Sequence, residues 1–330
     1  MGNKTILLTH TDLDGYGSNL LLETYDIRAR MVNLDNHIVD SYVLEMIRRL
    51  KEKEMDIPKA LFITDLGLKP EVAKELNEWY QRLPEDKKPT LKLFDHHKTA
   101  LHLNQYDWAT VIVGEGMNKP SGTSLFYEFL KSETDRKLPE EKQEKLNRLV
   151  ELIRSYDTWE WKETNDHLAS DLNDLFYLMK RNLFIQHRLD WLNGPYSVKS
   201  CFFEQERFLL SMERERIKNY LRAKSKQMVV LNDFFKNESG KYFNVGVLQA
   251  ENYISELGDH LCQTNRDLDF VAMFDVTKNK VSFRARKPEV DLTPLVKSFG
   301  GGGHSQAAGC SLNGIGFELI EKVYDKMVTK

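Results

Sequence analysis

Cysteine is scarce in this sequence: its 330 residues include only Cys201, Cys262 and Cys310, which lie far apart. Three widely spaced cysteines form no disulfide framework and offer no thiolate zinc site, so reduced thiols and a cytoplasmic location are expected. Long apolar stretches are also missing, since no run approaches the roughly 18 residues that cross a membrane. The first residues lack the longer apolar region of a signal peptide, which favours the same location and no membrane partner.

Positive charge is not in excess either. The chain has 47 Lys and Arg against 50 Asp and Glu, a formal net charge of −3. No global positive field therefore exists to hold long duplex nucleic acid through counterion release, and we do not expect such a partner. The length exceeds that of most single domains and predicts two.

What the N-terminal half does contain is a repeated strand and helix. Alternation of this length predicts a parallel sheet with helices on both faces. The predicted strands are 6–8, 30–34, 61–63, 91–94 and 108–113, and the predicted helices are 16–25, 40–53, 70–80, 121–130 and 139–154.

The rest of the chain changes character twice. Residues 166–228 are mostly helical and highly charged, and the strands predicted after them are 244–249, 268–274 and 280–286, with helices at 253–262 and 290–299. We therefore expect an α/β protein with an N-terminal parallel-sheet domain (1–185), a helical linker (186–228) and a smaller C-terminal α/β domain (229–330).

Acids and histidines follow several of the predicted strands. The four clusters are His10 with Asp12 and Asp14, Asp65 alone, Asp95 with His96 and His97, and Asp157 alone. On an extended loop the alternate residues His10, Asp12 and Asp14 would point to one side. Each cluster has an alternative reading, because Asp also favours turns and helix caps.

Together the clusters favour a metal site. They offer five carboxylates and three imidazoles, mostly from loops at the C-terminal edge of one parallel sheet, where ligands bind in such folds. Oxygen ligands with some imidazole suit Mn²⁺ or Mg²⁺ better than a structural zinc ion. Two such ions ~3.5–4 Å apart activate water in phosphoryl transfer.

A second feature is the run of four glycines at 300–303, followed by His304. Glycine N–H groups can form an anion-binding nest, to which a helix beginning after His304 would add its positive end. A flexible linker is the alternative. Arg284 and Arg286 lie on one face of a predicted strand and could clamp a phosphate, or could simply be solvated.

Two further groups remain ambiguous. Ser121 begins a predicted helix, where it is either an N-cap or a substrate contact. Trp159 and Trp161 could stack on a nucleobase or belong to a core.

These motifs, in this order, resemble those of the DHH phosphoesterase superfamily. His10, Asp12 and Asp14, then Asp65, the Asp95-His96-His97 run and Asp157 match its four motifs, and the 300–309 segment is similar to the DHHA1 domain. The resemblance covers nearly the whole chain. Its length and two domains are most similar to the bacterial oligoribonucleases, or nanoRNases, and related nucleotide phosphodiesterases.

The resemblance implies a role for each residue. One Mn²⁺ would be held by His10, Asp12 and Asp65, and the other by Asp14, Asp65, His96 and Asp157, with Asp65 bridging. His97 would face the scissile phosphate, and Asp95 would orient the imidazoles. The substrate would be gripped across the cleft between the domains by Gly301, Gly302, Gly303, His304 and Arg284, and Ser121 matches a helix start common in the family.

The predicted activity is a phosphodiesterase that uses two Mn²⁺ ions, with Mg²⁺ as an alternative, to degrade short RNA or dinucleotides to nucleoside monophosphates. A homodimer is compatible with this prediction. The competing functions are hydrolysis of a small nucleotide (3′-phosphoadenosine 5′-phosphate or a cyclic nucleotide), a RecJ-like single-strand DNA exonuclease, an inorganic pyrophosphatase and a non-catalytic nucleotide sensor.

Overall fold

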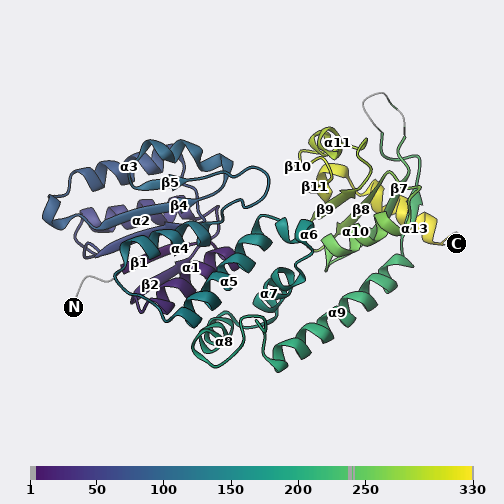
Figure 1. Ribbon diagram of the computed structural model, residues 1–330. Coiled ribbons are helices and arrows are strands. Elements are labelled where there is room, and N and C mark those ends of the chain that lie inside the picture. Colours follow the sequence, from purple (N-terminus) through teal and green to yellow (C-terminus); the bar gives the residue numbers. More distant parts are fainter. Residues whose placement is uncertain (1–4, 237–239, 241, 329–330) are drawn as a thin grey trace. The chain divides into compact units, whose positions relative to one another are not determined.

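The computed structural model describes residues 5–236, 240 and 242–328 (Figure 1). Residues 1–4, which entered the expectation of a cytoplasmic location, lie outside the described residues. The chain divides into two compact units, Met1–Leu210 and Ser211–Lys330, and each is described by itself.

The first unit contains a five-stranded parallel sheet in the order β2-β1-β3-β4-β5. Its strands are β1 (Thr5–Thr9), β2 (Ala29–Asn33), β3 (Ala60–Thr64), β4 (Thr90–Asp95) and β5 (Ala109–Val111). Strands β1 and β3 are buried along their whole length, as in parallel sheets covered on both faces. The predicted parallel α/β architecture is therefore confirmed.

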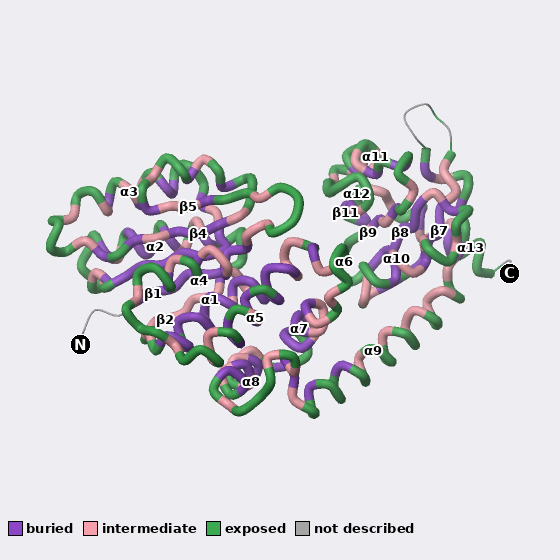
Figure 2. Tube along the Cα trace, viewed as in Figure 1, coloured by how far each residue is buried: buried purple, intermediate pink, exposed green. Residues whose placement is uncertain are grey.

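The strands in the middle of the sheet are mostly buried (Figure 2), and alternate residues of β1, β3 and β4 enter two different cores. Leu7, Phe62 and Phe94 pack with helices α1, α4 and α5, whereas Leu8 and Ile63 pack with α2 and α3 on the other face. The helices of this unit are α1 (Leu13–Thr24), α2 (Val39–Lys51), α3 (Pro70–Gln81), α4 (Gly122–Glu133), α5 (Glu140–Asp157), α6 (Glu160–Thr164), α7 (His167–Leu178) and α8 (Arg181–Asn193), with 3₁₀ helices η1 (Glu85–Lys87) and η2 (Lys98–Gln105).

Helix α1 begins earlier than predicted. The Asp12 side chain accepts the Gly15 N–H at 3.0 Å and caps the helix, so Asp14 lies in its first turn. The expectation that His10, Asp12 and Asp14 point together from an extended loop is therefore wrong. Asp157, expected between helices, is the last residue of α5.

The first unit extends beyond the expected boundary at residue 185. Trp191 and Leu192 of α8, together with Leu210, are buried in the core that also contains α1 and α5. The Trp191 indole N–H donates to the Ser200 carbonyl at 2.9 Å, which holds the following segment in place. Much of the expected linker 186–228 thus packs with the first unit, and the division falls inside α9 (Glu204–Ser225).

The second unit is built on a six-stranded mixed sheet in the order β10-β11-β9-β8-β7-β6, in which only the β7–β8 pair is parallel. Helix α10 and the end of α9 cover one face, and α11 and α13 cover the other. Its elements are β6 (Val229–Leu231), β7 (Val245–Gln249), α10 (Ile254–Thr264), β8 (Phe270–Asp275), β9 (Lys280–Ala285), α11 (Leu292–Ser298), β10 (Gly302–His304), β11 (Ala307–Ser311), α12 (Leu312–Ile315) and α13 (Glu318–Val328).

The helix expected after His304 is wrong. The glycine run enters β10, which pairs antiparallel with β11 through a tight turn. Strand β11 forms because Ala308 and Cys310 alternate into the core while the chain pairs with β9. Gly303 has φ of 142°, and a Cβ there would lie 2.5 Å from the Ala308 Cα, so the hairpin requires glycine.

A search of the described helices finds none with the length and apolar character needed to cross a bilayer.

Candidate metal and phosphoester site

The site lies where three parallel strands end. Thr9 of β1 pairs with Thr64 of β3, and Thr64 pairs with Phe94 of β4. The segments that follow these three strands therefore leave the sheet side by side. His10, Asp65 and the Asp95-His96-His97 run follow at this edge. Strand order therefore places Asp65 between the histidines that follow its two neighbours.

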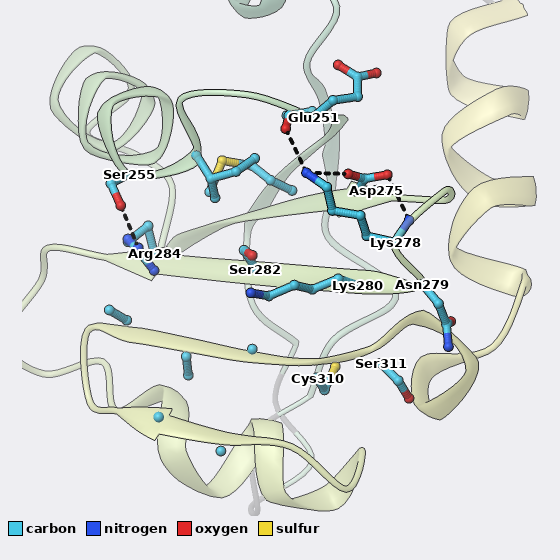
Figure 3. A pocket seen from close by; sticks show the side chains of 18 residues that line it. Glu251, Ser255, Asp275, Lys278, Asn279, Lys280, Ser282, Arg284, Cys310 and Ser311 are labelled. Atoms are coloured by element: carbon cyan, nitrogen blue, oxygen red, sulfur yellow. Dashed lines mark hydrogen bonds and ion pairs between the residues drawn. The ribbon is translucent and has the colours of Figure 1, made fainter. Parts of the chain in front are cut away.

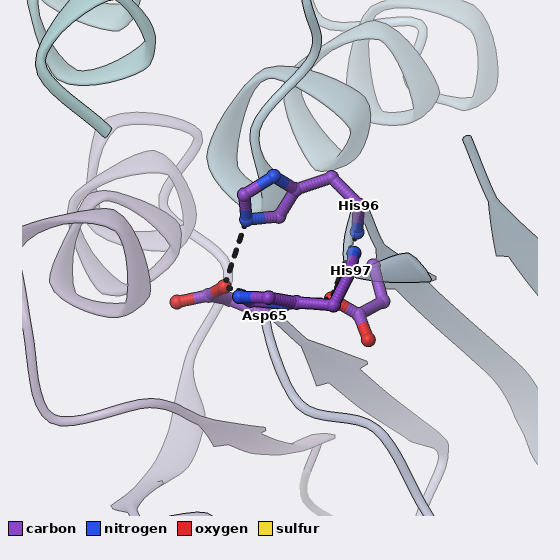
Figure 4. Close-up of side chains that lie close together, drawn as sticks. Asp65, His96 and His97 are labelled. Carbon is purple, nitrogen blue, oxygen red and sulfur yellow. Dashed lines mark hydrogen bonds and ion pairs between the residues drawn. The ribbon is translucent and has the colours of Figure 1, made fainter. Parts of the chain in front are cut away.

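Asp65 is the centre of the site. Its side chain is 2 % exposed, and its backbone has φ of 55°, held by an N–H donated to the Phe94 carbonyl at 2.9 Å. Asp tolerates this left-handed conformation better than most residues, and such strain is common at functional sites. One carboxylate oxygen lies 3.6 Å from His10 Nδ1 and the other 3.4 Å from His96 Nε2. Figure 4 shows His96 and His97 both directed toward this carboxylate.

Three more carboxylates complete two groups of possible metal ligands. Asp12 lies 2.7 Å from His10 Nδ1, and Asp157 lies 3.2 Å from His96 Nε2. Asp14 accepts N–H groups from the first turn of α4 at 2.7 and 3.0 Å, close to the positive end of that helix. Ligand atoms lie within 4.8 Å of one another in each of three sets, which are His10, Asp12 and Asp65; Asp14, His96 and Asp157; and Asp65, Asp95, His96 and His97.

Two carboxylates of this cluster have raised pKa values, as expected where positive charge is lacking nearby. Burial and the neighbouring Asp14 raise the pKa of Asp65 well above its usual range, and the same two causes raise the pKa of Asp157. The hydrogen bond to Asp12 and the nearby Asp65 carboxylate raise the pKa of His10 to about 10. Buried acids this close ionise together only when cations neutralise them.

Several buried polar atoms also lack partners. Within the described residues, Asp65 Oδ2 and Asp95 Oδ2 have no hydrogen-bond partner, and Asp157 Oδ2 and His96 Nε2 lie 3.2 Å apart without the geometry of a hydrogen bond. Such atoms are costly to leave unsatisfied. The available ligand atoms are carboxylate oxygens and imidazole nitrogens, which suit divalent metal ions.

His97 is held differently. Asp95 accepts the backbone N–H groups of His96 and His97 at 2.8 and 3.3 Å, and its same oxygen lies 2.8 Å from His97 Nδ1. This hydrogen bond raises the pKa of His97, whose side chain is half exposed. Asp95 is buried and unable to face a substrate, so it orients His97.

The second unit contains a separate cavity of about 740 Å³ (Figure 3). Arg284, Gly302 and Gly303, all predicted to bind substrate, line it, and Lys280 and Ser255 do so as well. The Arg284 guanidinium donates to Ser255 Oγ at 3.0 Å. A Cβ at Gly258 would collide with the Arg284 side chain, so this helical glycine makes room for it.

The two other residues predicted to bind substrate in this unit do not line the cavity. Gly301 packs behind the hairpin, where a Cβ would collide with the Gly309 carbonyl. His304 is exposed at the end of β10. Arg286, directly after β9, is also exposed and lies 4.0 Å from Asp259.

Comparison with protein-family models finds no match to the chain. The chain is 36% identical over 320 residues to oligoribonuclease NrnB of Bacillus subtilis (strain 168), with 95% of this chain and 74% of that protein covered. The chain belongs to the oligoribonuclease NrnB family. The predicted relationship to bacterial oligoribonucleases is thereby confirmed.

A solved structure shares the fold. The pGpG-specific phosphodiesterase PggH of Vibrio cholerae matches with a TM-score of 0.52 at 15% identity, over 98% of this chain and all of that one. At this identity the match supports the two-part α/β fold of this NrnB family member.

Gly122 of this NrnB family member allows α4 to pack closely against Asp65 and Asp14. A Cβ at Gly122, the first residue of α4, would lie 2.6 Å from the Asp65 Cβ and 3.0 Å from Asp14 Oδ2. The Thr123 hydroxyl also donates to the Asp14 carbonyl. Sequence analysis missed Gly122, although its place in a Ser-Gly-Thr-Ser helix start was the available signal.

Ser121 has a structural position. Its side chain is fully buried, and it forms a reciprocal capping box with Ser124, with Ser121 N–H donating to Ser124 Oγ at 2.8 Å. A fully buried cap cannot contact substrate, so that expectation is corrected. Ser121 instead holds the N-terminus of α4 against Asp14.

A buried ion pair supports the Asp157 side of the site. Arg154 donates to the Glu160 carboxylate at 2.8 Å and to the Lys119 carbonyl at 2.7 Å, and Glu160 accepts the Lys119 N–H at 2.7 Å. These contacts connect the turn after Asp157 to the segment preceding α4. Nothing in the sequence pattern indicated this pairing, because its members lie on separate elements.

Proposed function

We propose that this chain is a two-metal-dependent phosphodiesterase that degrades short oligoribonucleotides, including dinucleotides, to nucleoside monophosphates. The observation that carries the proposal is Asp65, a buried carboxylate with one oxygen toward His10 and the other toward His96. Membership of the oligoribonuclease NrnB family supports the same reaction class.

We propose Mn²⁺ as the metal, with Mg²⁺ as an alternative. One ion would be held by His10, Asp12 and Asp65, and the other by Asp14, Asp65, His96 and Asp157. When bound, these ions would lower the pKa of a water molecule and balance charge on the phosphoryl oxygens.

His97 contributes to the reaction directly in this proposal. Because Asp95 raises its pKa, the imidazole carries more positive charge near neutral pH than a free histidine would. Its Nδ1 is engaged by Asp95, which leaves Nε2 to donate to a phosphate oxygen. His97 would thus stabilise negative charge as it develops.

We further propose that the cavity of the second unit binds another part of the substrate. No ion pair to Arg284 is found in the described residues, since its two guanidinium hydrogen bonds go to Ser255 Oγ and the Phe283 carbonyl. It is therefore available to a phosphate. Gly302 and Gly303 would let the substrate approach the backbone, and Gly301 and His304, which flank them, would also bind it.

The decisive experiment incubates the purified chain and Mn²⁺ with RNA and DNA of two to twenty-four nucleotides, with 3′-phosphoadenosine 5′-phosphate, cyclic nucleotides and pyrophosphate beside them. The expected result is fastest release of nucleoside monophosphates from the shortest RNA. Preferred cleavage of one of the small phosphates, or degradation of long single-stranded DNA, would replace the proposal with the corresponding competitor. Binding of a dinucleotide without cleavage would indicate a sensor.

The cytoplasmic location and the homodimer remain predictions. Analytical ultracentrifugation across a concentration series tests the homodimer.

A further inference from the structure

Trp159 is conspicuous beside the metal site. It lies two residues after Asp157, is 60 % exposed, and has φ of 65°. Trp is usually well buried, and a bulky residue seldom adopts a left-handed backbone. By contrast, its neighbour Trp161 stacks on Tyr156 with ring centroids 6.0 Å apart. Of the two tryptophans that the sequence left ambiguous, only Trp159 presents an open ring.

The surroundings of Trp159 suit a nucleotide. The Lys162 ammonium lies 4.4 Å from its ring centroid, in cation–π contact with one face. The large exposed fraction leaves the rest of the indole to solvent. An aromatic ring with a cation beside it is the combination that binds a base and its phosphate in single-stranded nucleic acid.

A second exposed ring lies near the other group of metal ligands. Tyr177 of α7 is 59 % exposed, and the Arg181 guanidinium is 4.9 Å from its ring centroid. The same guanidinium lies 6.0 Å from the ring centroid of Tyr16, whose backbone N–H donates to the Asp12 carbonyl at 3.1 Å, so Tyr177 lies on the side of the site that carries Asp12. Trp159 therefore adjoins the Asp157 group, and Tyr177 the Asp12 group.

We propose that Trp159 and Tyr177 are stacking platforms for the two nucleobases on either side of the scissile phosphate. This inference rests on the proposed function, because a phosphodiester between two nucleosides carries one base on each side. Stacking requires no particular base, since every base has a π face. Short RNA of any sequence would bind, whereas phosphodiesters without bases would bind weakly.

The test combines ring removal with base removal. Kinetics are measured on a dinucleotide and on two analogues that lack either the 5′ or the 3′ base. Trp159→Ala is expected to raise KM about tenfold on the complete dinucleotide, with little change in kcat. On the analogue that lacks the base stacked on Trp159, the same substitution should change KM little. Tyr177→Ala should show the same pattern with the other analogue, and Trp159→Phe should retain most of the affinity.

Tyr196→Ala is the matched control, because Tyr196 is also exposed in the first unit but packs edge-on against Phe203. It should leave KM unchanged. The proposal is overturned if Trp159→Ala raises KM equally on all three substrates, or lowers kcat together with Mn²⁺ affinity, because the ring then only supports the turn after Asp157.

Failure of the proposed function has a different signature. If the wild-type chain cleaves no RNA, binding of a dinucleotide is followed through tryptophan fluorescence in the wild type and in Trp159→Phe. Quenching that disappears in the variant supports stacking independently of hydrolysis, and equal or absent quenching overturns it.

Discussion

The two units present opposite chemistry to an anionic substrate. At the edge of the first sheet, acids and imidazoles converge in a partly buried cluster whose carboxylates repel one another. In the cavity of the second unit, glycine backbone and the basic side chains of Lys280 and Arg284 line an accessible space. Under the proposed function, the first site would need cations before it could accept a phosphate, whereas the second could attract one directly. The proposal therefore assigns catalysis to the first unit and substrate binding to the second.

The difference follows from the two sheets. Parallel strands deliver their C-terminal residues to one edge, so groups distant in sequence meet there. In the second sheet, alternate residues of β9 face the cavity, and the β10–β11 hairpin faces it with backbone. The four predictions below test this separation.

The largest effect is expected from Asp65→Asn. Loss of the shared carboxylate should reduce kcat about a thousandfold or more, because metal ions supply several kcal/mol of charge stabilisation. Turnover on a dinucleotide and Mn²⁺ binding by calorimetry check this. Asp107→Asn, an exposed acid of the same unit, is the control and should be normal. Near-normal turnover by Asp65→Asn would contradict the central role of this carboxylate.

A paired glycine substitution distinguishes the two sites. Gly122→Ala should lower kcat about a hundredfold, because its Cβ would displace Asp65 and Asp14, and small misplacements are costly in catalysis. At Gly302 a Cβ would meet nothing within 4 Å, so Gly302→Ala should keep kcat and raise KM modestly. Steady-state kinetics of both variants measure kcat and KM for this comparison. Equal changes in kcat would mean that the two sites are not separated in this way.

Arg284→Gln should act on binding. Loss of a charge-assisted hydrogen bond to phosphate, about 1.5–3 kcal/mol, corresponds to a rise in KM of about ten- to a hundredfold with kcat preserved. Lys278→Gln is the matched control, because Lys278 lines the same cavity but lies 3.4 Å from Asp275. A comparable rise in KM in both variants would indicate a general electrostatic effect of positive charge in the cavity.

The smallest expected effect is the change with pH in how much bound Mn²⁺ stabilises the folded protein. In the metal-free chain, Asp65 and Asp157 have pKa values raised well above 3.8, so their protonated forms stabilise the fold. That stabilisation is complete below the ordinary pKa and is lost as the pH rises through the raised values. His10 acts in the same direction, with full stabilisation below pH 6.5 that is lost as the pH passes about 10.

Metal ions take the place of these protons, so the rise in Tm caused by Mn²⁺ should be a few degrees larger at pH 8 than at pH 5.5, roughly 2–4 °C per kcal/mol. Thermal denaturation at both pH values measures it, with Asp65→Asn as the control that should lose most of the difference. An equal rise at both pH values would contradict the raised pKa values.

Most of the first unit could be predicted from its sequence. Continuous apolar strands such as β1 and β3 and the helical spacing in α2 indicated their structure locally, and a parallel sheet then brings His10, Asp65 and His96 to one edge. The 300–309 segment could not be predicted in the same way. Its glycines and small residues are compatible with a loop, a helix start or a strand, and only pairing with β9 selects the strand.

The order of residues along the chain was enough to identify the chemical groups of the candidate sites, which are five acids, three imidazoles and a glycine-rich segment. How these groups are arranged became visible only in the folded protein. Ser121 became a buried cap, Asp65 acquired a left-handed backbone between two imidazoles, and Trp159 was left exposed while Trp161 was packed. The reason is physical: burial, backbone strain and pKa depend on neighbours from other elements, and a linear sequence does not contain those distances.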